Sequence, residues 1–211
     1  MYIPDLPGKK AHLKMAPLHR LSTLKIEEAP PENSRESAVL VLLFPASSEN
    51  ILDWEVLVIK RNIYDGVHSG QIAFPGGKCE DIDKDYADTA CRESHEELSL
   101  DRDKIEIVGL LSRLYVPPSN FTIYPVLAYA SCEMELIPDH REVVEYRKIP
   151  LKLFDPTLSE IFKIRIGREE YVNAPGYTIG DYFIWGATAM ILSELYQVAA
   201  EARLTISRNN P

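Results

Sequence analysis

Three carboxylates in one short stretch have the spacing of a divalent-cation site. Glu93, Glu96 and Glu97 stand three and four positions apart, so on a helix they share one face, with Arg92 beside them. Solvated carboxylates on one face repel one another by roughly a few tenths of a kcal/mol per pair. A bound hard divalent cation makes this arrangement of carboxylates favourable, because carboxylate oxygens are its preferred ligands. The spacing alone is compatible with a metal site or with a solvated acidic face.

A glycine turn precedes these glutamates. Residues 72–74 form a short apolar segment, and Pro75, Gly76 and Gly77 follow it, where paired glycines permit backbone angles that a side chain forbids. Such a turn can bring backbone carbonyls and amides close to a metal or a phosphate. The turn therefore favours the metal site over the solvated face, although the glycines could also serve the turn alone.

The glutamates must be positioned by a helix that packs on a sheet. Asp81, Asp83 and Asp85 are candidates for its N-cap. Small or apolar residues then recur at helical spacing and predict a narrow face that presses against strands; they are Ala87, Ala90, Cys91, Ser94 and Leu98. Because the glutamates lie on a different face, they remain available for chemistry.

The stretch from Gly70 to Leu100 resembles the signature of the Nudix hydrolases, G-x(5)-E-x(7)-R-E-U-x-E-E-x-G-U, where U is aliphatic. Gly77 matches its opening glycine, and the pairs at 92–93 and 96–97 match its R-E…E-E core. The sequence departs from the signature in four places. One extra residue separates Gly77 from Arg92, Asp83 stands in place of the first glutamate, and Ser94 and Ser99 replace an aliphatic residue and a glycine. None of these departures removes a proposed ligand.

The resemblance implies a fold, a cofactor and site residues. The expected fold is of the α/β (α+β) class, a mixed β-sheet sandwiched between helices, with Mg²⁺ or Mn²⁺ as the cofactor. The implied metal ligands are Glu93, Glu96, Glu97 and the backbone of Gly77. The implied catalytic residues are Glu96, Glu97, Arg92 and Glu142. Arg92 would orient the glutamates by charge-assisted hydrogen bonds, and Glu142, with Glu145 as its alternative, would be a distant base or an extra ligand.

Segments beside the box resemble the coenzyme A pyrophosphatase branch of the family. Residues 58–62 and 68–78 resemble the motif that precedes the box in that branch, although Gly66 stands where an arginine is usual. Residues 184–189, IWGATA, resemble a run before its last helix. The resulting candidates for substrate binding are Arg61, Lys78, Tyr115 and Phe121. The two cations would bind a diphosphate or remain solvated, and the two rings would stack on an adenine or cover a core edge. His68 and His95 are expected to be surface or capping residues.

The resemblance predicts hydrolysis of the diphosphate in a nucleoside diphosphate derivative, a small-molecule substrate. Coenzyme A or acyl-coenzyme A would be cut to 3′,5′-ADP and (acyl-)4′-phosphopantetheine. ADP-ribose and NADH are the alternative substrates. A further alternative is a Nudix-fold ligand-binding or regulatory protein with little catalysis. Such a protein is expected to have lost one of the box glutamates, whereas this chain keeps all three.

Length and composition indicate one domain. The 211 residues would form a single Nudix domain, with residues 1–36 as an N-terminal extension packed on it and residues 70–100 as the box region. No apolar run has membrane length, and the net charge of −9 disfavours nucleic acid as a partner. The first 25 residues are nevertheless basic, either as a solvated arm or as a site wall facing a phosphate; they include Lys9, Lys10, Lys14, Arg20 and Lys25. The three cysteines favour the cytoplasm, and the oligomeric state is left open, a homodimer being one option.

The remaining pattern predicts the elements around the box. Strands are expected at residues 38–44, 54–60, 105–114, 121–130 and 142–149, with Pro125 marking an edge or a bulge. The first two strands should form a hairpin. Helices are expected at residues 8–16 and 187–202. A late hairpin of residues 162–166 and 182–185 should turn at residues 173–176.

Overall fold

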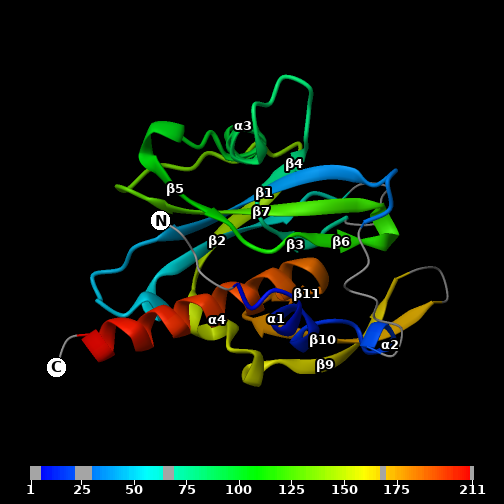
Figure 1. Ribbon diagram of the computed structural model, residues 1–211. Coiled ribbons are helices and arrows are strands. Elements are labelled where there is room, and N and C mark those ends of the chain that lie inside the picture. The colour runs from blue at the N-terminus through cyan, green and yellow to red at the C-terminus, as the bar shows by residue number, and fades with distance from the viewer. Residues whose placement is uncertain (1–5, 22–29, 64–68, 167–169, 210–211) are drawn as a thin grey trace.

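The computed structural model of the protein describes residues 6–21, 30–63, 69–166 and 170–209, with backbone only from residue 203 onward. Gly66 and His68, which were singled out above, lie outside the described residues. The elements form a mixed sheet with helices on both faces (Figure 1). The expected sandwich of helices around a mixed β-sheet is thereby confirmed.

The main sheet is built around two long strands. β1 (Arg35–Phe44) runs parallel to β7 (Phe121–Ala130), so that Arg35 lies opposite Phe121. β1 also pairs antiparallel with β2 (Glu55–Arg61), which confirms the first hairpin. The sheet order is β3-β2-β1-β7-β5, with β4 on β1, β6 on β7 and β8 on β2. The other strands are β3 (Ile72–Ala73), β4 (Gly76–Lys78), β5 (Ile105–Leu110), β6 (Leu114–Val116) and β8 (Val143–Pro150).

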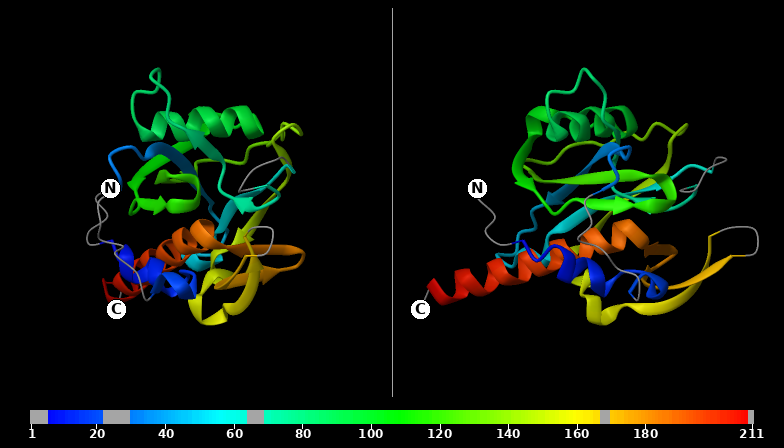
Figure 2. Two further views of the ribbon diagram at one scale, coloured as in Figure 1. Left: turned by 90° about the vertical axis from the view of Figure 1, so that its right-hand side faces the viewer. Right: turned by 45° about the vertical axis from the view of Figure 1, so that its right-hand side comes forward.

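Successive apolar side chains of β1 point to opposite faces of this sheet and contribute to the core on each side. Leu40 and Leu42 are buried against one side, where α3 (Tyr86–Leu98) contributes Ala90, Cys91 and Leu98. Val41 and Leu43 are buried on the other side, where α4 (Gly186–Asn209) contributes Met190, Ile191 and Leu195. Successive strand side chains point to opposite faces, so one apolar run serves two cores. Figure 2 shows α3 and α4 on opposite sides of the sheet.

Pro125 lies in the middle of β7, not at an edge or a bulge as predicted. The expected continuous strand over residues 105–114 is instead divided into β5 and β6, whose last and first pairs with β7 are Leu110 with Val126 and Leu114 with Ile123. Pro125 falls between these two partners, and its carbonyl accepts from the Leu111 N–H at 2.9 Å. Because proline has no N–H to donate, a central strand tolerates it opposite such a break.

The late hairpin was predicted with the wrong turn. Residues 173–176 lie inside β10 (Tyr171–Ile179), which pairs with β9 (Glu160–Arg165) and β11 (Tyr182–Trp185) in a three-stranded sheet. The turn between β10 and β11 is made by Gly180, with φ of +63°, and Asp181. Pro175 lies opposite Ile161 of β9. The proline and glycine that indicated a turn were therefore overridden by strand pairing on both sides.

A buried glutamate joins the N-terminal segment to the last helix. This segment comprises α1 (Lys9–Lys14) and α2 (Leu18–Leu21). Glu194 of α4 is fully buried and accepts hydrogen bonds from the backbone of Gly8 and Ser112, at 3.1 and 3.2 Å. His12 Nε2 lies 3.0 Å from Glu194 Oε2, the oxygen that also accepts from Ser112. The contacts of Gly8 and His12 with Glu194 thus fix the course of the chain before α2.

Short 3₁₀ turns complete the structure. They are η1 (Ile51–Asp53), η2 (Arg102–Lys104), η3 (Pro117–Ser119), η4 (Leu151–Phe154) and η5 (Pro156–Leu158). None of the helices within the described residues combines the length and the apolarity that crossing a bilayer requires.

Candidate active site

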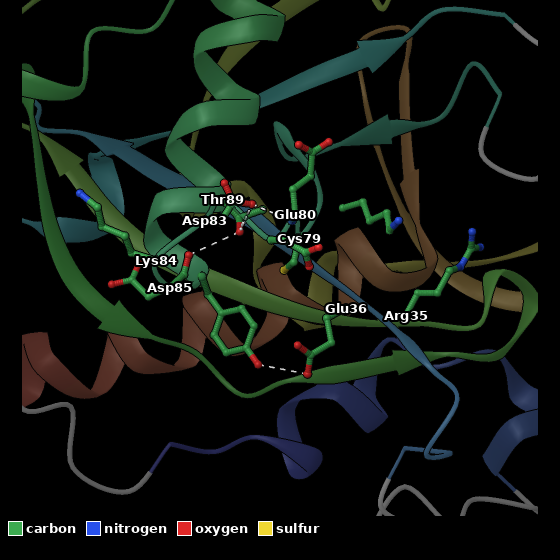
Figure 3. Close-up of a pocket in the computed structure, with 11 residues that line it drawn as sticks. Arg35, Glu36, Cys79, Glu80, Asp83, Lys84, Asp85 and Thr89 are labelled. Carbon is green, nitrogen blue, oxygen red and sulfur yellow. Dashed lines mark hydrogen bonds between the residues drawn. The ribbon is translucent and has the colours of Figure 1, made fainter.

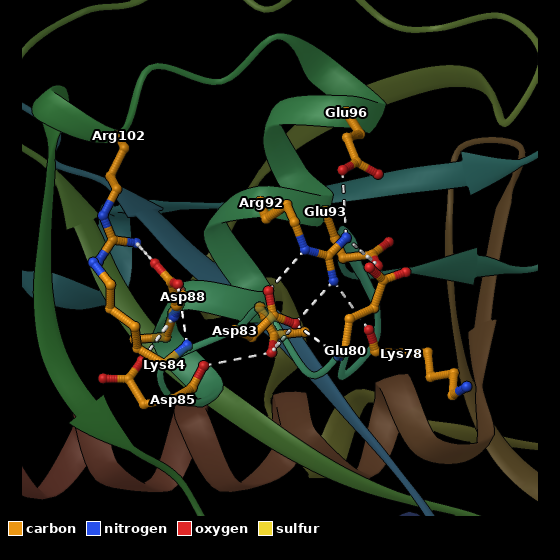
Figure 4. A network of polar contacts seen from close by, with 12 residues as sticks. Lys78, Glu80, Asp83, Lys84, Asp85, Asp88, Arg92, Glu93, Glu96 and Arg102 are labelled. Carbon is orange, nitrogen blue, oxygen red and sulfur yellow. Dashed lines mark hydrogen bonds and ion pairs between the residues drawn. The ribbon is translucent and has the colours of Figure 1, made fainter.

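The helix that carries the glutamates begins at Asp85. The Asp85 carboxylate accepts from the Asp88 N–H at 2.8 Å. Of the three candidate N-cap residues, Asp85 is therefore the one that caps the helix. Asp83 has a different partner. It accepts from Arg92 Nε at 2.8 Å and from Arg92 Nη2 at 3.0 Å, while the Thr89 hydroxyl donates to it at 2.8 Å (Figure 4). These hydrogen bonds hold the pKa of Asp83 far below its usual range.

Arg92 connects the glycine turn to the glutamates. Its Nη2 donates to the carbonyl of Lys78 at 3.1 Å. Its Nη1 donates to Glu93 Oε1 at 2.9 Å and lies 3.3 Å from Glu96 Oε1. One guanidinium therefore contacts an aspartate, a backbone carbonyl and two glutamates, which fixes its plane and the orientation of both glutamates.

Glu97 is the buried member of the glutamate set. It is 1% exposed, and its Oε2 accepts from the Gly76 N–H at 2.9 Å. Its Oε1 lies 3.6 Å from Nη1 of Arg61. Burial raises the pKa of Glu97 to about 8, and the charges of Glu142 and Glu93 act in the same direction. Burial likewise raises the pKa of Glu93.

The two glycines of the turn are required for different reasons. Gly76 has φ of +143°, and an added Cβ would lie 2.4 Å from the carbonyl oxygen of Ala38 on β1. Gly77 faces the helix instead, where an added Cβ would lie 2.1 Å from Glu93 Oε2. Gly76 is required because the β1 backbone leaves no room for a side chain. Gly77 is required because the Glu93 carboxylate of α3 occupies the space where a Cβ would lie.

The two serines that depart from the signature have structural partners. Ser94 is fully buried, and its hydroxyl donates to the carbonyl of Ala90 at 2.6 Å. Ser99 ends α3 in the left-handed conformation, with φ of 52°, where the signature has glycine. His95, predicted as a surface or capping residue, places Nδ1 3.0 Å from the carbonyl of Leu100. Neither serine displaces a glutamate.

The donor set suits a hard divalent cation, although it is not a preformed site. Within the described residues, no three Asp, Glu, His or Cys side chains converge as metal ligands. Arg92 lies between Glu93 and Glu96, and Glu97 is directed at Gly76. The raised pKa of both Glu93 and Glu97 nevertheless shows the electrostatic cost of burying these carboxylates, which a cation would offset. Coordination requires these side chains to move toward one another.

A cleft of about 1070 Å³ reaches the glycine turn. Its walls come from β1, the glycine turn, the η3 loop, β11 and the start of α4. Arg61, Lys78 and Phe121, which the sequence singled out, all line it. Arg61 therefore faces the cleft while it contacts Glu97, and its buried Nε has no hydrogen-bond partner among the described residues.

The aromatic candidates differ in position. Phe121 lines the cleft, with the Arg35 guanidinium carbon 4.0 Å from its ring centroid. Tyr115 donates its hydroxyl to Asn120 at 2.9 Å and is not among the described residues that line the cleft. Trp185 lines it instead. The motif at residues 184–189 marked this tryptophan, but the sequence offered no reason to place it in the site.

The two candidate bases have different surroundings. Glu145 is paired, lying 3.5 Å from Lys60 Nζ and 3.7 Å from Arg147 Nη2. Glu142 is exposed, and its charge is close enough to raise the pKa of both Glu93 and Glu97. Its backbone carbonyl accepts from the Asn62 N–H at 2.7 Å, one residue beyond Arg61. These contacts favour Glu142 over Glu145 as the base.

A second cavity, of about 640 Å³, lies beside the loop before α3 (Figure 3). Two pairs of its lining side chains are hydrogen-bonded, Tyr86 with Glu36 and Thr89 with Asp83. The hydroxyls of Tyr86 and Tyr124 both donate to Glu36 Oε1, at 3.1 and 3.0 Å, and the two rings stack. Burial raises the pKa of the Cys79 thiol, which makes it a poor nucleophile. The described residues of this cavity thus give less support to a reaction centre than those of the cleft beside Glu97.

Known proteins share both the sequence and the fold. Residues 34–168 match the family model described as NUDIX domain. A human protein named mitochondrial coenzyme A diphosphatase NUDT8 is 30% identical over 202 residues, which cover 94% of this chain and 82% of that protein. The mitochondrial Nudix hydrolase 15 of Arabidopsis thaliana is 31% identical over 79% of this chain and 59% of its own length.

A solved structure supports the fold. The Nudix hydrolase RenU of M. smegmatis superposes with a TM-score of 0.53 at 18% identity, covering 82% of this chain and 88% of that one. The match of the family model covers more than half of the chain and includes the glycine turn, Arg92 and all three glutamates. The chain therefore belongs to the Nudix hydrolase family and is a Nudix pyrophosphohydrolase.

Proposed function

We propose that the protein hydrolyses the diphosphate of coenzyme A or an acyl-coenzyme A to 3′,5′-ADP and (acyl-)4′-phosphopantetheine. The observation that carries this proposal is the position of Arg61, which lines a 1070 Å³ cleft and lies 3.6 Å from a buried box glutamate. A diphosphate beside Arg61 would be adjacent to the carboxylates that suit a cation. The printed name of the human relative, a coenzyme A diphosphatase, supports this substrate.

Nudix hydrolases in general need divalent metal ions. Here Mg²⁺ or Mn²⁺ would be held by Glu93, Glu96 and Glu97 with a backbone carbonyl of the glycine turn, at Gly77 or its neighbour Gly76. When bound, the cation would lower the pKa of a water molecule and neutralise charge on the diphosphate. Arg92 positions Glu93 and Glu96 through its hydrogen bond and ion pair with them.

The remaining roles concern diphosphate binding, proton transfer and base stacking. Arg61 and Lys78 would bind the diphosphate oxygens, because both are cations that line the cleft next to the glycine turn. Glu142 would accept the proton of the attacking water, since it is exposed and its charge raises the pKa of both Glu93 and Glu97. The aromatic surface for the base would come from Phe121 and Trp185.

Incubation of the purified protein with Mg²⁺ or Mn²⁺ and a substrate panel, followed by chromatography, tests this proposal. The panel is coenzyme A, acetyl-coenzyme A, ADP-ribose, NADH and a dinucleoside polyphosphate. Release of 3′,5′-ADP from the coenzyme A substrates alone is expected. Cleavage of only another member would keep the Nudix chemistry and overturn the coenzyme A assignment. Binding without metal-dependent cleavage of any member would instead identify a ligand-binding protein.

We propose the cytoplasm as the compartment, because the three cysteines are odd in number and lack C-x-x-C spacing. The three cysteines Cys79, Cys91 and Cys132 are all free in the structure. Free thiols are typical of reducing compartments.

A further inference from the structure

The cleft is positively charged in a chain of net charge −9. Its described lining includes four lysine or arginine side chains and one carboxylate, that of Glu170. The four cations are Arg20, Arg61, Lys78 and Arg165. Arg61 and Lys78 lie next to the glycine turn and are assigned above to the diphosphate. Arg20 comes from the N-terminal segment and has no role in that assignment.

Arg20 is half-buried in this cleft. Within the described residues its guanidinium has neither a hydrogen bond nor an ion pair, although it lies near Tyr115. Burial lowers the pKa of Arg20, which reflects the cost of desolvating a cation that has no anionic partner among the described residues. A guanidinium remains charged in proteins, so this cost is recovered only when an anion enters the cleft.

Arg20 and the glycine turn belong to different walls of the cleft. Figure 1 shows α2 beside β9 and β10, whereas β4 is paired with β1 in the main sheet and lies next to α3. Both views in Figure 2 keep this separation. An anion beside Arg20 would therefore be a different group from the diphosphate beside Gly77.

The fold holds the backbone at Arg20 in place. Its N–H donates to the carbonyl of Pro17 at 2.9 Å, which closes the turn of α2. The preceding residues are fixed by Glu194, which binds Gly8 and His12 within the fold. A fixed backbone reduces the conformational freedom that the Arg20 segment loses when an anion binds.

We propose that Arg20 binds a second anionic group of the substrate, a phosphomonoester on the nucleoside, and so makes the protein selective for nucleotides that carry one. This inference rests on the proposed function, because a coenzyme A substrate has a 3′-phosphate on its ribose in addition to the diphosphate. A planar guanidinium matches the oxygens of such a phosphate.

The test compares coenzyme A with dephospho-coenzyme A, which lacks only the 3′-phosphate. For the unchanged protein, kcat/KM is expected to be roughly 10- to 100-fold higher with coenzyme A, the range of a charge-assisted hydrogen bond. Arg20→Gln should raise KM for coenzyme A by that factor and leave dephospho-coenzyme A unaffected. Arg20→Lys should recover part of the difference. Lys10→Gln, an exposed cation of the same segment, is the matched control and should change neither substrate.

Binding measured by calorimetry separates this inference from the proposed function. Unchanged protein should bind 3′,5′-ADP more tightly than AMP, and Arg20→Gln should bind the two alike. If coenzyme A is not cleaved while this binding difference persists, the substrate assignment fails and the Arg20 site stands. If Arg20→Gln lowers kcat/KM equally for both coenzyme A substrates, or retains the preference for 3′,5′-ADP, the Arg20 site is wrong.

Discussion

Arg92 binds both carboxylate oxygens of Asp83, with Nε 2.8 Å from one and Nη2 3.0 Å from the other. Asp83 stands where the Nudix signature has glutamate, and the loop before Arg92 is one residue longer than in the signature. A shorter carboxylate on a longer loop therefore supplies a bidentate partner to the arginine that contacts Glu93 and Glu96.

Asp83→Asn is expected to reduce turnover by roughly 10- to 100-fold, the cost of losing a group that orients metal ligands. Turnover should fall because Arg92 would keep only part of its bidentate contact with residue 83. The apparent affinity for Mg²⁺, measured by titration of activity, should fall as well. Asp81→Asn changes an exposed carboxylate of the same loop and serves as the control. Equal turnover in Asp83→Asn and the unchanged protein would show that Arg92 needs no such partner.

Alanine substitutions at Gly76 and Gly77 are expected to affect different quantities, stability at Gly76 and turnover at Gly77. Gly77→Ala should keep its unfolding free energy within about 1 kcal/mol but lose about 100-fold in turnover, because its Cβ would displace the Glu93 carboxylate. Gly76→Ala should be destabilised by at least about 1–3 kcal/mol, because its Cβ would meet the β1 backbone at an unfavourable φ. Urea unfolding and product release measure both quantities. Full activity in Gly77→Ala would contradict the position assigned to Glu93.

Glu142→Gln is expected to lower kcat by roughly 10²- to 10⁴-fold, the contribution of a general base. Glu145→Gln is the matched control on β8 and should retain turnover, because Glu145 is engaged with Lys60 and Arg147. Steady-state kinetics at saturating metal distinguishes them. A large loss in Glu145→Gln with normal turnover in Glu142→Gln would reverse the assignment of the base.

Glu194 predicts a pH dependence of stability. Burial alone would raise its pKa, but His12 and Ser112 lower it below its ordinary value. A carboxylate whose folded pKa is depressed stabilises the fold above its unfolded pKa, and this contribution is lost as pH falls through the folded pKa. Glu194→Gln should therefore reduce the unfolding free energy by roughly 1.5–3 kcal/mol at pH 7.

The difference between Glu194→Gln and the unchanged protein should narrow when urea unfolding is repeated at about pH 3. Glu201→Gln, an exposed change on the same helix, is the control and should follow the unchanged protein at both pH values. A difference that stays constant or widens on acidification would show that the Glu194 carboxylate is not stabilised in its charged form.

Local patterns predicted the elements that depend on near neighbours. Spacing and residue type predicted the apolar run in β1 and the helix after Gly186, and they narrowed the cap of α3 to three aspartates, of which the structure uses Asp85. The turn at residues 173–176 was wrong, because Pro175 and Gly176 are held in β10 by pairing with β9 and β11. Such pairing between distant segments leaves no local pattern.

The candidate site shows the same division. The spacing of Glu93, Glu96 and Glu97 predicted that they share one face of a helix. The contact of Glu97 with Gly76 and Arg61, by contrast, depends on the fold. The sequence offered Arg20 as part of a basic arm or a site wall, and only packing of the N-terminal segment places it in the cleft. Residues that meet through tertiary packing cannot be assigned from the order of the chain.

Metal-dependent release of 3′,5′-ADP from coenzyme A, measured for the unchanged protein and for Glu97→Gln, tests the central claim most directly. The account predicts turnover with Mg²⁺ or Mn²⁺, none after chelation, and a loss of more than about 10³-fold in Glu97→Gln. That variant should remain folded, because glutamine can accept the Gly76 hydrogen bond and removes a buried charge. Near-normal turnover in folded Glu97→Gln, or turnover that survives chelation, would contradict the assignment of metal chemistry to these glutamates.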